Sequence, residues 1–143
     1  MRRIRVAALL VGALALGSGC GGAGTTIITV LGYTVVIKTA PPTTAQVGAS
    51  VPVAFTVTEN ESDGSSKPAS GKSFTVTVTA GGGTINGAAS AVLTTAADGS
   101  VSMTWILGSL VGTQTVRGSV AADKFLDVSV TAITPPATQI VLA

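Results

Sequence analysis

The chain of 143 residues contains no histidine and a single cysteine, Cys20. Without histidine it cannot form a serine–histidine or cysteine–histidine nucleophile pair or a histidine-ligated metal site. One cysteine cannot form an intrachain disulfide, so the fold must depend on its hydrophobic core. Aromatic residues make up only 3% of the chain and charged residues 10%, which is little material for a ligand pocket. We therefore expect no catalytic activity, no cofactor and no metal site.

The first nineteen residues have the pattern of an export signal. Three arginines within residues 2–5 form a basic start. Residues 6–16 then form an apolar stretch that is too short to span a bilayer. The sequence therefore predicts that residues 1–19 are a signal peptide and that the protein is exported to the cell envelope.

Residues 17–19, Gly-Ser-Gly, precede Cys20 and resemble the lipobox of bacterial lipoproteins. In that motif the signal is removed and the cysteine becomes the lipid-carrying first residue. The usual large aliphatic residue stands one position early here, at Leu16, and ordinary cleavage after Ala15 or Ala23 is the alternative. Each buried methylene contributes about 0.8 kcal/mol, so two or three acyl chains would hold the protein at a membrane almost permanently. We expect Cys20 to be the lipid attachment residue of a protein anchored at a membrane or the cell surface.

Loss of the signal would also remove most of the positive charge. Three of the eight basic residues lie within the first five positions, which leaves five basic against six acidic residues, a net charge of −1. A nearly neutral protein has no electrostatic basis for binding nucleic acid or anionic lipid. We expect no nucleic-acid partner.

The rest of the chain is rich in Thr, Val and Gly and alternates between apolar and polar residues, as β-strands with one buried face do. In residues 100–107 this alternation places Val101, Met103, Trp105 and Leu107 on one face, with Trp105 as the largest core residue. Turn residues recur about every ten positions, which predicts an all-β, immunoglobulin-like antiparallel β-sandwich of about seven strands. The predicted strands are residues 33–39, 51–59, 73–80, 91–95, 100–107, 112–120 and 125–132.

Residues 60–71 are polar and predict a long loop between two strands. Glu59, Glu61 and Asp63 match the first half of a calcium-binding loop. Lys67 and Ser70 stand where the second half would need a carbonyl- or water-linked position and a bidentate glutamate. The preferred interpretation is a solvated acidic loop, and calcium binding is the alternative.

Two other surface features predict structural roles. The threonines of residues 75–79 lie on the outer face of a strand, where threonine is common, although such a face can also bind glycans or ice-like lattices. Arg117 and Lys124 are expected to pair with Asp127 or Asp123, and such surface pairs contribute about 0–1 kcal/mol each.

Residues 96–120 combine an Asp-Gly turn, an alternating strand, Leu107-Gly108, Val111-Gly112 and a Thr-x-x-Val strand start. This combination resembles the second half of group 1 bacterial immunoglobulin-like domains, the invasin and intimin type. Residues 67–84 contain a proline-containing turn, a core strand and a glycine-rich corner at Gly81–Gly83. They resemble the segment that precedes this second half in domains of that family. The likeness covers roughly residues 35–134.

The resemblance implies a seven-stranded sandwich that serves as a spacer or adhesive module in bacterial surface proteins, often in tandem. It divides the chain into a flexible tether (20–32), the sandwich (33–134) and a linker or the start of a further repeat (135–143). The expected partners are the membrane, through the lipid anchor, and other surface proteins or host-surface ligands. The alternatives are a ligand-binding lipoprotein, for glycan or calcium, and an accessory domain of an enzyme on another chain.

Overall fold

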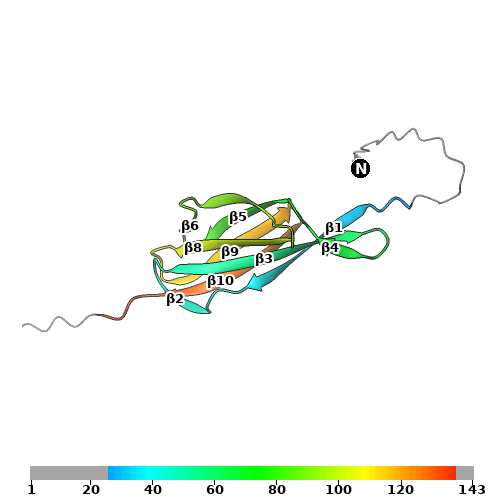
Figure 1. Ribbon diagram of the computed structural model, residues 1–143. Coiled ribbons are helices and arrows are strands. Elements are labelled where there is room, and N and C mark those ends of the chain that lie inside the picture. The colour runs from blue at the N-terminus through cyan, green and yellow to red at the C-terminus, as the bar shows by residue number, and fades with distance from the viewer. Residues whose placement is uncertain (1–25, 138–143) are drawn as a thin grey trace, which may run out of the picture.

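The computed structural model describes residues 26–137. Within this range the chain forms ten strands in two facing sheets and no helix (Figure 1). The first sheet has the order β1 (Val30–Thr39), β3 (Ser50–Glu61), β8 (Ser100–Leu107) and β6 (Gly83–Ile85), with β4 (Ser66–Pro68) paired to the end of β3. The second has the order β2 (Thr44–Gln46), β10 (Lys124–Ile133), β9 (Gly112–Ala121), β5 (Ser73–Ala80) and β7 (Ser90–Thr94). The all-β sandwich predicted from the sequence is confirmed.

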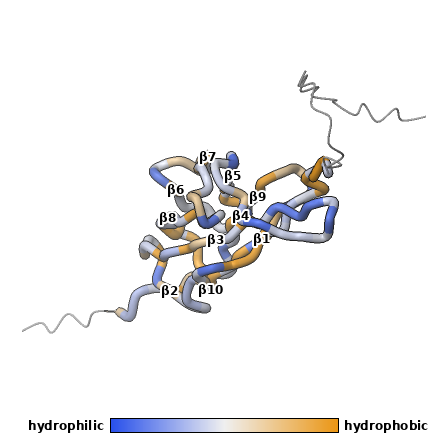
Figure 2. Tube along the Cα trace, turned by 45° about the vertical axis from the view of Figure 1, so that its right-hand side comes forward, coloured by the Kyte–Doolittle hydropathy of each residue, from blue (hydrophilic) through white to orange (hydrophobic). Residues whose placement is uncertain are grey.

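The core fills the space between the sheets with the alternate residues that the sequence pattern indicated. In β8 the residues Val101, Met103, Trp105 and Leu107 are buried while their neighbours face solvent. Trp105 is the largest fully buried side chain. The two sheets meet at Phe55 of β3 and Phe74 of β5, whose ring centroids lie 5.2 Å apart. Figure 2 shows the hydrophobic stretches running along the strands between hydrophilic turns.

Strand β2 is an element that the sequence pattern did not reveal. It pairs with the end of β10, with Thr44 opposite Thr131, and it is the one parallel neighbour among the described strands. Three residues are too few to show an alternating pattern. Pro41 and Pro42 separate β2 from β1, as expected from their lack of a backbone N–H.

The predicted long loop at residues 60–71 is wrong in part. Strand β3 continues to Glu61, and β4 pairs back onto it with Glu59 opposite Lys67. Strand β1 follows the same extension and begins at Val30, three residues earlier than the sequence indicated. The polar residues here lack the apolar alternation of a half-buried strand, because this hairpin projects beyond the core and packs little apolar surface.

One end of the sandwich is closed by a glycine corner around a buried glutamine. The Gln114 Oε1 accepts a hydrogen bond from the Gly108 N–H at 2.7 Å, and its Nε2 donates to the carbonyl oxygens of Gly108 (3.1 Å) and Leu110 (2.7 Å). A Cβ at Gly81, which has φ of +79°, would lie 2.2 Å from the Gln114 side chain. The predicted role of Gly81–Gly83 as a corner is thus explained by a polar side chain that the hydrophobic pattern could not identify.

Candidate contact surfaces

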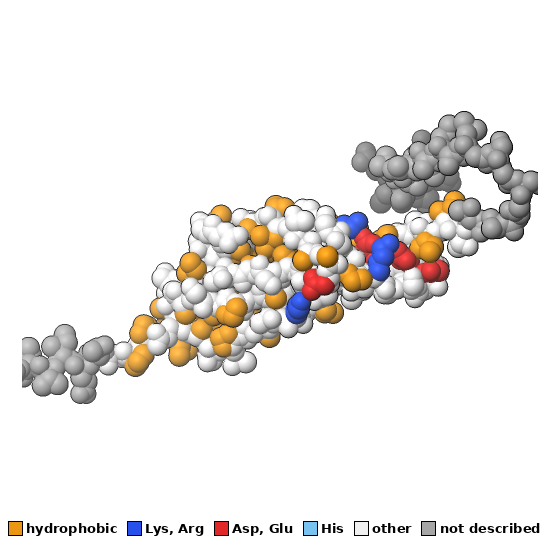
Figure 3. All heavy atoms as spheres, in the orientation of Figure 1, with side chains coloured by type: hydrophobic (Ala, Val, Ile, Leu, Met, Phe, Trp, Pro, Cys, Tyr) orange, Lys and Arg blue, Asp and Glu red, His pale blue; other side chains and the backbone are white. Residues whose placement is uncertain are grey.

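Charged side chains gather toward the end of the molecule where β1 begins (Figure 3). Five of the eleven charged residues in the described range belong to residues 59–72, which we call the charged arm. It comprises the end of β3, a turn at residues 62–65, β4 and the loop that follows. Gly64 adopts φ of +84° in this turn, and its N–H donates to the Glu61 carbonyl at 3.1 Å. The positive φ explains why glycine stands at this position.

Glu59 is the one buried carboxylate in the described part of the chain, with 4% of its surface exposed. The Nζ of Lys72 lies 2.7 Å from its Oε1, and that of Lys67 lies 3.6 Å from its Oε2. The Lys72 contact departs from the direction of an ideal hydrogen bond, but opposite charges at this distance attract at any angle. The ammonium of Lys72 lowers the pKa of Glu59, against the effect of burial, and Lys67 adds to this.

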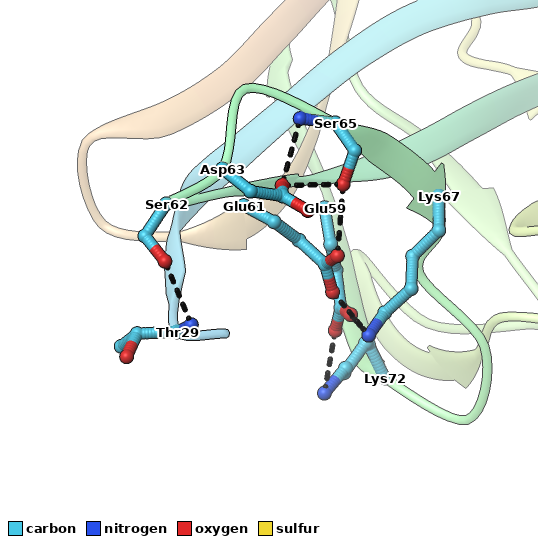
Figure 4. Close-up of polar contacts among 8 residues, drawn as sticks. All are labelled: Thr29, Glu59, Glu61, Ser62, Asp63, Ser65, Lys67 and Lys72. Carbon is cyan, nitrogen blue, oxygen red and sulfur yellow. Dashed lines mark hydrogen bonds and ion pairs between the residues drawn. The ribbon is translucent and has the colours of Figure 1, made fainter. Parts of the chain in front are cut away.

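The remaining carboxylates of the arm are held by Ser65 and Lys67 (Figure 4). The Ser65 Oγ lies 2.6 Å from Asp63 Oδ1 and 3.0 Å from Glu61 Oε2. Its N–H also donates to Asp63 Oδ1 at 2.9 Å, and these hydrogen bonds lower the pKa of Asp63. Lys67 forms a close ion pair with Glu61. The arm is therefore a self-paired network in which each carboxylate already has an ion-pair or hydrogen-bond partner.

This pairing bears on the calcium alternative. Glu59, Glu61 and Asp63 lie in one hairpin, as the sequence suggested, but their oxygens point to lysine and serine donors. Residues 26–137 contain no group of three or more acidic, cysteine or histidine side chains placed to hold a metal ion, and no pocket. Sequence reasoning missed Lys72 as the main partner, because it lies thirteen positions after Glu59 in the chain.

A second polar surface is the outer face of the sheet formed by β7, β5, β9 and β10. Serine and threonine hydroxyls pair across the strands, Thr77 with Ser90 at 3.0 Å and Thr115 with Ser129 at 2.9 Å. Cross-strand pairs of this kind stabilise a sheet. The outward position predicted for the threonines of residues 75–79 is confirmed, since all three are half-buried or exposed.

The charged centre of this face is Arg117. It donates to both oxygens of Asp127, at 2.7 and 2.8 Å, and its guanidinium lies 3.9 Å from the ring centre of Phe125. The bidentate contact lowers the pKa of Asp127 and raises that of Arg117. Lys124 pairs with Asp123 at 3.3 Å. Both ion pairs expected from the sequence are confirmed.

Comparison with models of protein families, with curated proteins and with solved structures finds no match. Among the described residues no helix is long and apolar enough to cross a membrane. The predicted signal peptide (1–19), Cys20 and residues 138–143 of the predicted linker or further repeat lie outside residues 26–137. The lipid attachment at Cys20 therefore stays a prediction.

Proposed function

We propose that the chain is a lipid-anchored surface module, a bacterial immunoglobulin-like sandwich without catalytic activity that acts as a spacer or protein-contact domain in the cell envelope. The observation that carries this proposal is the placement of the two ends of the described chain. The chain enters β1 at one end of an elongated sandwich and leaves β10 at the opposite end (Figure 1). A domain of this form separates whatever precedes it from whatever follows.

The length of the strands sets the reach of such a spacer. Strand β10 contains ten residues, which span roughly 33 Å at about 3.3 Å per residue. Joined to a membrane through Cys20, the sandwich would therefore hold its far end several nanometres from the lipid surface. The outer face around Arg117, with its array of hydroxyls, is the surface we assign to protein contacts.

The turn positions also support the family assignment within this proposal. The Asp98-Gly99 turn directly precedes β8, Leu107-Gly108 ends it, and Gly112 starts β9. A Cβ at Gly99 would lie 2.3 Å from the Val57 carbonyl oxygen, so only glycine fits there. Asp98 accepts a hydrogen bond from the Ser100 N–H at 3.0 Å and pairs with Lys38 of β1.

The anchor is tested by determining the mature N-terminus of the exported protein by mass spectrometry. We expect an acylated Cys20, and we expect Cys20→Ala to lose both fatty-acid labelling and stable membrane association after repeated dilution washes. Ser18→Ala is the matched control, since it keeps a small residue before the cysteine and should leave acylation intact. An unmodified N-terminus at Leu16 or Gly24, as ordinary cleavage would leave, would overturn the proposal.

A further inference from the structure

The first described residues present large apolar side chains to solvent. Ile27 is 81% exposed, Ile28 50% and Leu31 72%. We call these three residues the apolar tip. It lies at the end of the molecule from which β1 starts, and Figure 3 shows hydrophobic side chains exposed there beside the charged arm. Scattered apolar residues are common on protein surfaces, but three within five positions at one end form a local patch.

The charged arm holds this tip away from the core. The Thr29 N–H donates to Ser62 Oγ at 3.1 Å (Figure 4). The Ser62 N–H donates to the Thr29 carbonyl at 2.9 Å. Val30 then pairs with Glu61 in the β1–β3 ladder. With both backbone groups of Thr29 bonded to the arm, the adjoining apolar side chains are fixed at the end of the sandwich and have no core residue to pack against.

The distance along the chain from Cys20 indicates what covers this patch. Ile27 follows Cys20 by seven residues, which reach at most about 25 Å when extended. A flexible glycine-rich segment of this length has a root-mean-square span of about 15 Å. If Cys20 carries lipid, the tip remains within a short distance of the bilayer surface, at a high effective concentration relative to it.

We propose that the apolar tip inserts into the lipid interface beside the lipidated Cys20, so that the module contacts the membrane at a second point and its sandwich is oriented outward. This inference rests on the proposed lipid anchor. The contact is apolar in kind, because the neighbouring arm carries three carboxylates and two lysines in a self-paired network and offers no excess positive charge. Its strength should therefore change little with salt or with the fraction of anionic lipid.

The first experiment measures depth in the bilayer with the acylated protein in phosphatidylcholine vesicles. Leu31→Trp places a fluorophore in the tip, and Val92→Trp places one at a similarly exposed position of β7, 68% against 72% for Leu31. Trp105 is fully buried and gives the same background in both variants. Quenching by brominated lipids should be at least about two-fold stronger for Leu31→Trp. Equal quenching of the two variants would refute insertion.

The second experiment is independent of the anchor and uses the chain from Gly21, which keeps the whole described fold. Flotation with phosphatidylcholine vesicles should show weak, reversible binding, and Ile27→Ser/Ile28→Ser/Leu31→Ser should lower the partition coefficient by about ten-fold or more. Val92→Ser/Leu110→Ser changes exposed apolar residues elsewhere and should leave the partition coefficient unchanged.

Equal partition of the Gly21 chain and its triple variant would overturn the proposal. The proposal would also be overturned if the Gly21 chain were a dimer and its triple variant a monomer, since the apolar tip would then be covered by a second copy of the chain and not by lipid. If the Gly21 chain binds vesicles but the protein exported by cells carries no acyl group on Cys20, the anchor alone is rejected and the lipid contact of the tip stands.

Discussion

Gly118 gives a prediction in which the sequence and the structure lead to opposite signs for the change in stability caused by Gly118→Ala. It lies in the middle of β9, where glycine normally weakens a strand by about 0.5–1 kcal/mol relative to alanine. On this ground Gly118→Ala should stabilise the protein. In the structure, however, a Cβ at Gly118 would lie 2.7 Å from Phe74 Cζ and 2.9 Å from Phe55 Cζ. Both rings are fully buried, so neither can move into free space.

The packing effect should dominate. Inserting a methyl group into a filled core costs about 1–3 kcal/mol, which exceeds the gain in strand propensity. We therefore expect Gly118→Ala to lower the free energy of unfolding by about 1–2 kcal/mol, or the melting temperature by about 4–8 °C. Urea unfolding of the mature chain, followed by the fluorescence of the buried Trp105, measures this change.

Gly32→Ala is the matched control. Gly32 also lies within a strand and lacks a positive φ, but a Cβ there would meet only Lys124 Cε, at 3.9 Å. This variant should be neutral or more stable by up to about 1 kcal/mol. Phe74→Leu combined with Gly118→Ala should recover about 1 kcal/mol relative to the sum of the single changes. A Gly118→Ala protein as stable as the wild type would refute the argument from packing.

Two further predictions concern stability. Trp105→Ala should cost about 3–5 kcal/mol in urea unfolding, because the side chain is fully buried, and a wild-type midpoint would contradict its core position. Stability should be nearly constant from about pH 6 to 8, since histidine is absent. It should fall as the pH drops below 4.5, the unfolded pKa of Glu59, because Glu59, Asp98 and Asp127 have lowered pKa values in the folded state and their contribution is lost on protonation. Lys72 has a raised pKa, so its contribution is lost only above pH 10.5. Chemical unfolding across pH checks both limits, and a maximum of stability near pH 3 would contradict the assignment.

The local pattern of the sequence was enough to identify the sandwich and its core. In β8 and β10 every second residue faces inward, as in an alternating strand, because the pleat sends successive side chains to opposite faces. The exceptions to the apolar-inward pattern are Ile106, Phe125 and Ile133, which are apolar but exposed. The Asp98-Gly99 turn and the glycine corner were equally visible, since both depend on conformations that glycine adopts most readily.

The sequence could not show the partners of polar residues. Gln114 is fully buried and Glu59 nearly so, against the usual tendency of their residue types, and each is accommodated by groups from other turns and strands. Nothing in the residues around Glu59 indicates that Lys72 will lie beside it. Such pairs depend on how distant segments meet after collapse, which no local period encodes.

By itself, then, the sequence determined the class of fold, the inward face of β8 and a hypothesis for how the protein is anchored. The tertiary structure alone decided that β2 pairs in parallel with β10, that residues 60–68 form a hairpin rather than a loop, and that the apolar tip is held in solvent. Side-chain alternation is a property of one strand and can be read locally. Pairing and exposure are properties of the assembled sheets, because each depends on what a second segment covers.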